Sequence, residues 1–191
     1  MKLNVIENSQ SVFRFKLTGT STNFANAVRR IATNSVPCFA IDSVTFYENT
    51  SAMFDEYIAH RLGLIPIKTP SKDYDEKDEV VFTLNAEGPT TIYSKDLKTS
   101  DKSVKVANEA IPIMKLAEGQ VLRLDGKAVM GTGMKSSKFQ PGLVTYEPNE
   151  SKDEFQFYVE TFGQMPPAEI ISKTLNIASA NIKEAHKELK K

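Results

Sequence analysis

FANAVRRIATNSVP, residues 24–37, has the residue spacing of a short amphipathic helix. Its apolar side chains fall on one face and are Phe24, Val28, Ile31 and Ala32. Arg29 and Arg30 lie on the opposite face. Pro37 ends the helix, because a proline disfavours the helical conformation at the residue before it. Two adjacent arginines on one short helix raise the question of what they bind.

The segments on either side of this helix predict strands. VFRFKL (12–17) alternates apolar and basic residues, which is the period of a half-buried strand. Residues 39–47 are strand-forming, but their alternation slips near Asp42, which indicates a β-bulge. FDEYIAHRLGLIPI (54–67) then predicts a short helix that ends at Gly63, followed by an extended apolar piece.

The middle of the chain differs from its two ends. Between about 80 and 146 it holds short strand patterns separated by turns rich in Gly, Pro and Lys, namely VVFTL, TTIYS and QVLRL. Strict alternation returns in FQFYVET (155–161), and Pro166 and Pro167 then open a long helix. This order predicts an α+β protein in which the two ends form one discontinuous domain around an inserted, mostly β domain.

The long C-terminal helix carries a sustained apolar seam with spacings of three and four residues. Its members are Ala168, Ile171, Leu175, Ala178, Ile182, Ala185 and Leu189. This heptad pattern is typical of a helix that packs lengthwise against another helix. The seam fits two arrangements: an amphipathic helix that closes its own domain, or one that also meets a helix of a partner.

Composition excludes several classes of protein. The 191 residues carry 24 Lys and Arg against 24 Asp and Glu, so no global positive field attracts nucleic acid. The single cysteine, Cys38, excludes an internal disulfide and any multi-cysteine metal site. We see neither a signal peptide in MKLNVIENSQ nor a long apolar run, and we expect a cytoplasmic protein.

Candidates for chemistry are few. His186 lies on the charged side of the terminal helix, where solvation is the simpler interpretation. His60 follows Glu56 by four residues, which favours a helix-stabilising pair over an acid–base dyad. Cys38 follows a proline among apolar residues and is expected to be a buried structural thiol. No catalytic group and no metal site is predicted.

The segment GTGMKSSKFQP (131–141) resembles a phosphate-binding loop only superficially. A P-loop needs a glycine directly before the lysine, and Met134 occupies that position. The flanking segments also do not read as a strand followed by a helix. What remains is a basic surface loop with Lys135 and Lys138, which is either a solvated turn or a docking element.

Three segments together resemble a known family. They are FANAVRRIATNSVPCFAIDSVTFYEN followed by FDEYIAHRLGLIPIKT, then GTGMKSSKFQP, and FYVETFGQMPPAEIISKTLNIA. The long ordered pattern resembles the alpha-like (D) subunits of archaeal DNA-directed RNA polymerases. That family is related to bacterial alpha and to the third-largest subunit of eukaryotic polymerase II.

The resemblance implies an architecture and a role. A dimerisation domain would comprise residues 1–46 and 151–191, with an insert domain at 47–150. The chain would form a heterodimer with the smaller alpha-like subunit L. The small zinc-binding subunits N and P and the large catalytic subunits would dock on that pair, and catalysis would belong to the large subunits.

The resemblance also assigns roles to residues. The expected interface with the helix of subunit L comprises Phe24, Val28, Ile31, Ile171, Leu175, Ala178, Ile182 and Leu189. The expected docking residues for a large subunit are Arg29, Arg30, Lys135 and Lys138. An arginine fork suits such an interface, because it binds carboxylates and backbone carbonyls in partly desolvated surroundings.

Two departures from the family pattern matter. Met134 replaces a lysine of the family's G-x-G-K-x-H-A-K loop, and Ser136 and Ser137 replace its His-Ala. Some relatives also carry an iron–sulfur cluster in a cysteine-rich insertion. Cys38 alone cannot ligate a cluster, so no cofactor is expected.

Two other functions remain as alternatives. A nucleic-acid-binding module would use Arg29, Arg30, Lys135 and Lys138, and its affinity would fall steeply with salt. A small enzyme would use His60 or Cys38. The scaffold role is preferred to both, because the apolar seams favour a paired-helix interface and the charge balance is neutral.

Overall fold

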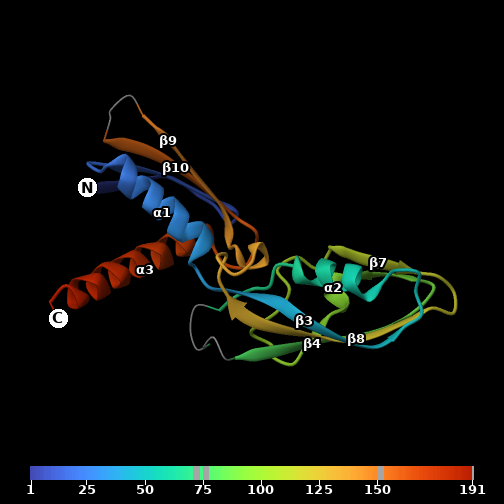
Figure 1. Ribbon diagram of the computed structural model, residues 1–191. Coiled ribbons are helices and arrows are strands. Elements are labelled where there is room, and N and C mark those ends of the chain that lie inside the picture. Colours follow the sequence, from blue (N-terminus) through green and yellow to red (C-terminus); the bar gives the residue numbers. More distant parts are fainter. Residues whose placement is uncertain (71–73, 75–77, 150–152, 191) are drawn as a thin grey trace. The chain divides into compact units, whose positions relative to one another are not determined.

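The chain divides into two units, and unit 2 is inserted into the sequence of unit 1. The computed structural model describes residues 1–70, 74, 78–149 and 153–190 (Figure 1). Unit 1 joins Met1–Pro37 to Thr132–Lys191, and unit 2 is Cys38–Gly131. Together they contain helices and antiparallel sheets, so the predicted α+β class is confirmed.

Unit 1 is one four-stranded antiparallel sheet with two helices. The strand order is β1-β2-β10-β9. The elements are β1 (Lys2–Asn8), β2 (Val12–Thr18), α1 (Thr22–Asn34), β9 (Gly142–Pro148), β10 (Glu154–Thr161) and α3 (Pro167–Glu188). A short 3₁₀ turn, Ser137–Phe139, precedes β9.

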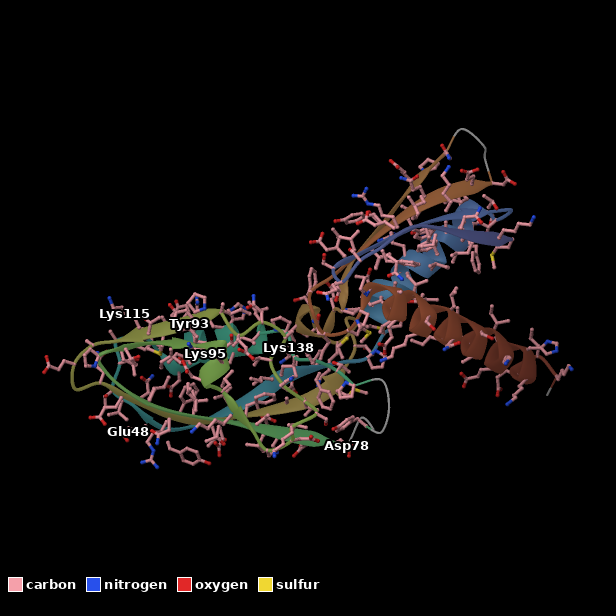
Figure 2. All side chains as sticks on the ribbon, turned by 180° about the vertical axis from the view of Figure 1, so that it is seen from behind. Glu48, Asp78, Tyr93, Lys95, Lys115 and Lys138 are labelled. Atoms are coloured by element: carbon pink, nitrogen blue, oxygen red, sulfur yellow. The ribbon has the colours of Figure 1, made fainter. Side chains whose placement is uncertain are left out.

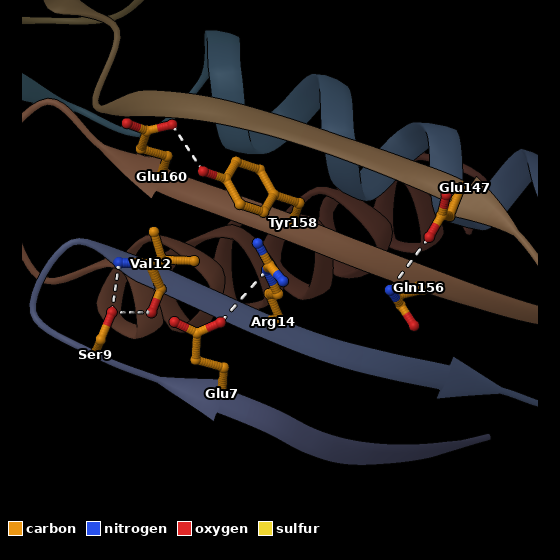
Figure 3. A network of polar contacts seen from close by, with 8 residues as sticks. All are labelled: Glu7, Ser9, Val12, Arg14, Glu147, Gln156, Tyr158 and Glu160. Atoms are coloured by element: carbon orange, nitrogen blue, oxygen red, sulfur yellow. Dashed lines mark hydrogen bonds and ion pairs between the residues drawn. The ribbon is translucent and has the colours of Figure 1, made fainter.

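The helices cover one face of this sheet, because the strands alternate apolar and polar residues. In β2 and β10 the apolar positions lie opposite each other, with Phe15 paired to Phe157. Their rings stack with centroids 4.8 Å apart. Helix α1 packs on β9, and α3 packs on β2 and β10 and against α1. The polar positions between them point to the other face (Figure 3).

Unit 2 is a second antiparallel sheet with a two-stranded ribbon and one helix. The sheet order is β3-β8-β4-β6, and the ribbon is β5-β7. The elements are β3 (Cys38–Asn49), α2 (Asp55–Gly63), β4 (Glu79–Glu87), β5 (Thr90–Tyr93), β6 (Lys98–Thr99), β7 (Pro112–Leu116) and β8 (Val121–Gly131), with a 3₁₀ turn at Ser94–Asp96. Helix α2 contacts β3 and β7 and buries Ile58 and Leu62.

The local predictions around the opening helix are confirmed. The slip near Asp42 is a register shift between Ile41 and Ser43 in the pairing of β3 with β8. Helix α2 ends at Gly63, as its sequence predicts. The three short patterns in the middle of the chain belong to β4, β5 and β8.

The discontinuous layout agrees with the two units, but the expected boundaries at 46/47 and 150/151 need correction. The units meet at 37/38 and 131/132. Strand β3 belongs entirely to unit 2 because it pairs along its length with β8. Strand β9 belongs to unit 1 because it pairs with β10. Residues 150–152, where the second boundary was expected, lie outside the described residues.

Candidate subunit interface

Helix α1 (Thr22–Asn34) forms at the predicted place, because its N-terminal cap and its apolar stripe both favour a helix over these residues. The Ser21 side-chain oxygen accepts a hydrogen bond from the Phe24 amide at 3.4 Å, which caps the first turn. Ala25, Val28 and Ala32 are buried on the inner face. The two alanines let the helix backbone come close to its neighbours, so α1 fits tightly against β9 and α3.

The outer face of α1 presents the arginine pair in two different states. Arg29 is half-buried, and its Nε and Nη2 donate to Asn26 Oδ1 at 3.2 and 2.9 Å. This contact holds the guanidinium in one orientation. Arg30 is exposed and forms no hydrogen bond or ion pair with any residue that the structure describes. Arg30 is therefore the residue of the pair whose donors remain available.

The 131–141 loop docks on the C-terminal end of α1, which the sequence alone did not reveal. The Met134 amide donates to the Asn34 carbonyl at 2.9 Å, which satisfies one of the carbonyls left open where the helix ends. A Cβ on Gly133 would lie 2.4 Å from the Thr33 carbonyl oxygen, so only glycine allows this approach. Two segments about 100 residues apart in sequence thus form one surface of unit 1.

The side chains of Lys135 and Lys138 in this loop both lie near one aromatic ring. The Lys135 and Lys138 Nζ atoms lie 5.5 and 5.3 Å from the centroid of the Phe139 ring. Phe139 is fully buried and anchors the loop in the core of unit 1. Lys135 is exposed and Lys138 is half-buried, so the loop presents ordered positive charge beside the end of α1.

The apolar seam of α3 changes its surroundings along the helix. The exposed fraction is 3% for Ile171, 37% for Leu175, 66% for Ile182 and 86% for Leu189. The buried residues of α3 all lie in its first eight positions. Figure 1 shows the C-terminal end of the helix extending clear of the sheet of unit 1. The first part therefore closes its own domain, and the later part leaves an apolar seam uncovered.

This gradient corrects part of the predicted interface. Val28 and Ile171 are 2% and 3% exposed within the chain's own core, so neither side chain presents a surface to a partner. The sequence predicted them as interface residues because each lies on the same apolar stripe of its helix as neighbours that face outward. Phe24, Ile31 and Ala178 are half-buried, whereas Leu175, Ile182 and Leu189 are exposed.

Strand β1 adds apolar surface that was not predicted from the sequence. Leu3 pairs with Leu17 and Val5 with Phe15, so both belong to the helix-covered face of the sheet. Leu17 and Phe15 are buried, yet Leu3 and Val5 are 41% and 58% exposed. The alternation in KLNVIEN was the available signal. Among the described residues, neither α1 nor α3 packs substantially on β1, so this edge of the apolar face is open.

The opposite face of the same sheet is polar and internally paired. Arg14 forms an ion pair with Glu7 at 3.4 Å and lies 5.1 Å from the centre of the Tyr158 ring (Figure 3). The hydrogen bond from Tyr158 to Glu160 raises the pKa of the phenol. On the same face, Lys16 lies 3.0 Å from Glu154, and its hydrogen bond holds the pKa of Glu154 below the usual value. Charged and hydrogen-bonded side chains thus occupy this face, in contrast to the apolar residues of the helix-covered face.

The residues considered for chemistry are not brought together. Cys38 is buried at the start of β3, as predicted for a structural thiol. His60 is exposed on α2, and within the described part of the chain no ion pair joins it to Glu56. The described residues contain no group of three or more His, Cys, Asp or Glu that could hold a metal ion. No helix in the described ranges is long and apolar enough to cross a membrane.

The sequence matches known proteins over most of its length. Residues 40–145 match the family of the RNA polymerase Rpb3/RpoA insert domain. DNA-directed RNA polymerase subunit Rpo3 of Methanocaldococcus jannaschii is 46% identical over 155 residues, which are 81% of this chain and 78% of that protein. The chain belongs to the Rpo3 family of DNA-directed RNA polymerase subunits.

Other members of the Rpo3 family extend the comparison. Rpo3 of Pyrococcus furiosus is 46% identical over 77% of this chain, and Rpo3 of Methanosarcina acetivorans is 41% identical over 75% of it. The matches cover 59% of each of these two longer relatives. The family resemblance inferred from the three sequence segments is thereby confirmed.

Proposed function

We propose that this chain is a non-catalytic assembly subunit of a DNA-directed RNA polymerase and pairs through unit 1 with the smaller alpha-like subunit L. The observation that carries the proposal is the apolar seam of α3, which continues through Leu175, Ile182 and Leu189 after its own core has ended. A helix seam of this kind is stabilised when a second helix covers it. The relatives are DNA-directed RNA polymerase subunits, which supports a place for this chain in a polymerase assembly.

The open surface of unit 1 has the composition that a stable subunit contact needs. Leu3 and Val5 on β1 enlarge the apolar area beside the α3 seam, on the same face of the sheet. Burial of apolar surface contributes about 25 cal/mol per Å², so several such side chains supply the main driving force for pairing. The half-buried Phe24 and Ile31 of α1 would complete the contact.

The outer face of α1 and the docked loop would meet a large catalytic subunit. Arg30 keeps its donors available, and the fork of Arg29 is already oriented by Asn26. Lys135 and Lys138 add positive charge next to the end of the same helix. Such ordered cations suit carboxylates or backbone carbonyls of a protein partner. Small subunits N and P would dock on the assembled pair.

Catalysis and its metal would belong to the large subunits, in the cytoplasm. We also propose that the chain carries no iron–sulfur cluster, because its single cysteine cannot supply the thiolates. The purified chain should then show no visible cluster absorption and no stoichiometric iron.

Co-purification with subunit L tests the pairing. The double variant Leu175→Glu, Ile182→Glu places charges in the open half of the seam and should abolish co-purification with tagged L. Leu143→Glu is the matched control, because Leu143 is 47% exposed on the strand β9 of the same sheet. The control should co-purify like the wild type. A double variant that still pairs with L at the wild-type level would refute the proposed interface.

A further inference from the structure

Helix α2 of unit 2 has a second apolar face that points outward. Its inner face buries Ile58 and Leu62. Its outer stripe runs through Phe54, Tyr57, Arg61 and Leu64, at spacings of three, four and three residues. The three apolar members are 71%, 65% and 56% exposed, in that order. One short segment thus presents three large exposed apolar side chains, which is typical of a recognition surface rather than of scattered surface residues.

Two hollows lie along this stripe. The larger, about 630 Å³, is lined by Met53, Phe54 and Tyr57 from the α2 side and by Met114 from β7. The smaller, about 180 Å³, is lined by Leu64 and Ile65 together with Ile111 and Ile113. Both are lined mainly by apolar side chains, and each is large enough to accept at least one side chain of a partner.

Arg61 borders both hollows and is fixed between them. Its Nε donates to the Ile113 carbonyl and its Nη2 to the Pro112 carbonyl, both at 2.7 Å. These bonds tie α2 to β7 at the floor of the groove. Tyr57 and Leu64, which mark the two hollows, are seven residues apart. That separation is two helical turns, or about 10.5 Å along the axis.

The charged side chains that line the groove are basic. Arg61 and Lys115 line the larger hollow beside Gln120 and His60, and no carboxylate lies among its described lining residues. Lys115 is exposed on β7, on the ribbon side of unit 2 that also carries Lys95, whereas Glu48 lies on the β3 side (Figure 2). Charge complementarity therefore favours an occupant that brings carboxylates beside its apolar residues.

We propose that this groove, formed by α2 and β7, binds an acidic amphipathic helix of another protein. Two apolar side chains of that helix, seven residues apart, would enter the two hollows, the larger one in the hollow beside Phe54 and Tyr57. Its carboxylates would face Lys115 and Arg61. This is helix-in-groove recognition, in which anchors two turns apart set the register. The inference concerns unit 2 alone and does not depend on the pairing proposed for unit 1.

Fluorescence anisotropy with the full-length chain tests the proposal. The probe is a labelled Ala-rich peptide of about 16 residues, long enough to form a helix, with Phe and Leu seven residues apart and flanking glutamates. The matched probe has lysines in place of the glutamates. We expect the acidic probe to bind and the basic probe to bind at least about tenfold more weakly, because like charges then meet at Lys115.

Variants locate the binding to the groove. Tyr57→Ser and Leu64→Ser should each lower the affinity of the chain for the acidic probe about tenfold, as expected for truncated anchor residues. Tyr47→Ser is the matched control, since Tyr47 is 64% exposed in the same unit and lies outside both hollows. Equal binding of the two probes, no binding of either, or unchanged affinity in Tyr57→Ser would overturn the proposal. So would self-association of the chain that Tyr57→Ser abolishes, since a second copy would then be the occupant.

A photo-crosslinker at position 57 in the assembled complex gives a second measurement. The crosslinked peptide should map by mass spectrometry to a helical segment with carboxylates and apolar residues seven apart. The same group at position 47 should give no such product. A crosslink to a basic segment, or none at all, contradicts the proposed partner.

Discussion

The two halves of α3 carry the same apolar spacing but lie in different surroundings. Ile171, in the first half, is 3% exposed, and Ile182, in the second half, is 66% exposed. Both residues are isoleucines of one seam on one helix, so their intrinsic preferences are the same. The comparison teaches that a heptad seam shows which side of a helix is apolar. It does not show whether that side is covered by the chain itself or by another chain.

Truncation in the first half should have the largest effect. Ile171→Ala removes a buried side chain from the core of unit 1 and should lower the free energy of unfolding by about 2–5 kcal/mol. Urea unfolding followed by circular dichroism measures this. Ile182→Ala is the control, and its free energy of unfolding should stay within about 0.5 kcal/mol of that of the wild type. Equal losses for both variants would remove the distinction between the halves.

Truncation in the second half should act on pairing instead. Ile182→Ala is expected to weaken the affinity for subunit L by about tenfold, because an exposed anchor loses its contact only in the complex. Isothermal titration calorimetry with the two purified subunits measures the change. The same variant should keep the circular dichroism spectrum of the wild type. A pairing affinity that does not change would show that the open seam serves another purpose.

The arginine pair of α1 extends the comparison to a different partner. Arg30→Ala should reduce assembly with the large subunit more than it reduces pairing with L, because Arg30 lies on the outer face of α1. Loss of an interface hot spot can cost about 2 kcal/mol or more. Quantitative pull-down from a reconstitution mixture measures both steps. Lys187→Ala, an exposed cation at the end of α3, is the control. Equal losses at the two steps would refute the assignment of Arg30.

The polar face of the sheet in unit 1 should show the smallest effect. The hydrogen bonds from Lys16 and Asn149 hold the pKa of Glu154 below its usual value in the folded protein. The stabilisation is therefore present above the ordinary carboxyl pKa and is lost as the pH falls through the lowered folded value. Glu154→Gln should be slightly less stable than wild type near neutral pH, and the two should converge on acidification. Thermal unfolding from neutral to acid pH measures this, and a difference that grows toward acid pH would contradict the assigned direction.

Local structure could be predicted from sequence because it depends on neighbouring residues. Helix α1, the slip near Asp42 and the end of α2 at Gly63 all follow from periodicity, caps and helix-ending residues. The domain boundaries could not be placed, because they depend on which strands pair. Residues 38–46 look like a continuation of the N-terminal segment, yet their hydrogen bonds go to β8.

The candidate interface was predictable only in outline. Val28 and Ile31 belong to one apolar stripe, but only Val28 is fully buried in the chain's own core. Leu3 and Val5 escaped notice because their exposure follows from their position on an edge strand that the helices leave open. The outward stripe of α2 was missed as well, because Tyr57 and Ile58 look equally suited to a core until β3 and β7 cover one side of the helix.

The sequence by itself determined the α-helices of this protein, the faces on which their apolar residues lie, and its family, together with the strands β2, β3, β4, β5, β8 and β10. Only the tertiary structure decided which of those faces are covered, and by which part of the chain. The physical reason is that periodicity sets the direction of a side chain relative to the axis of its own element. Burial depends on neighbours brought in from distant sequence, as when the loop around Gly133 closes on the end of α1.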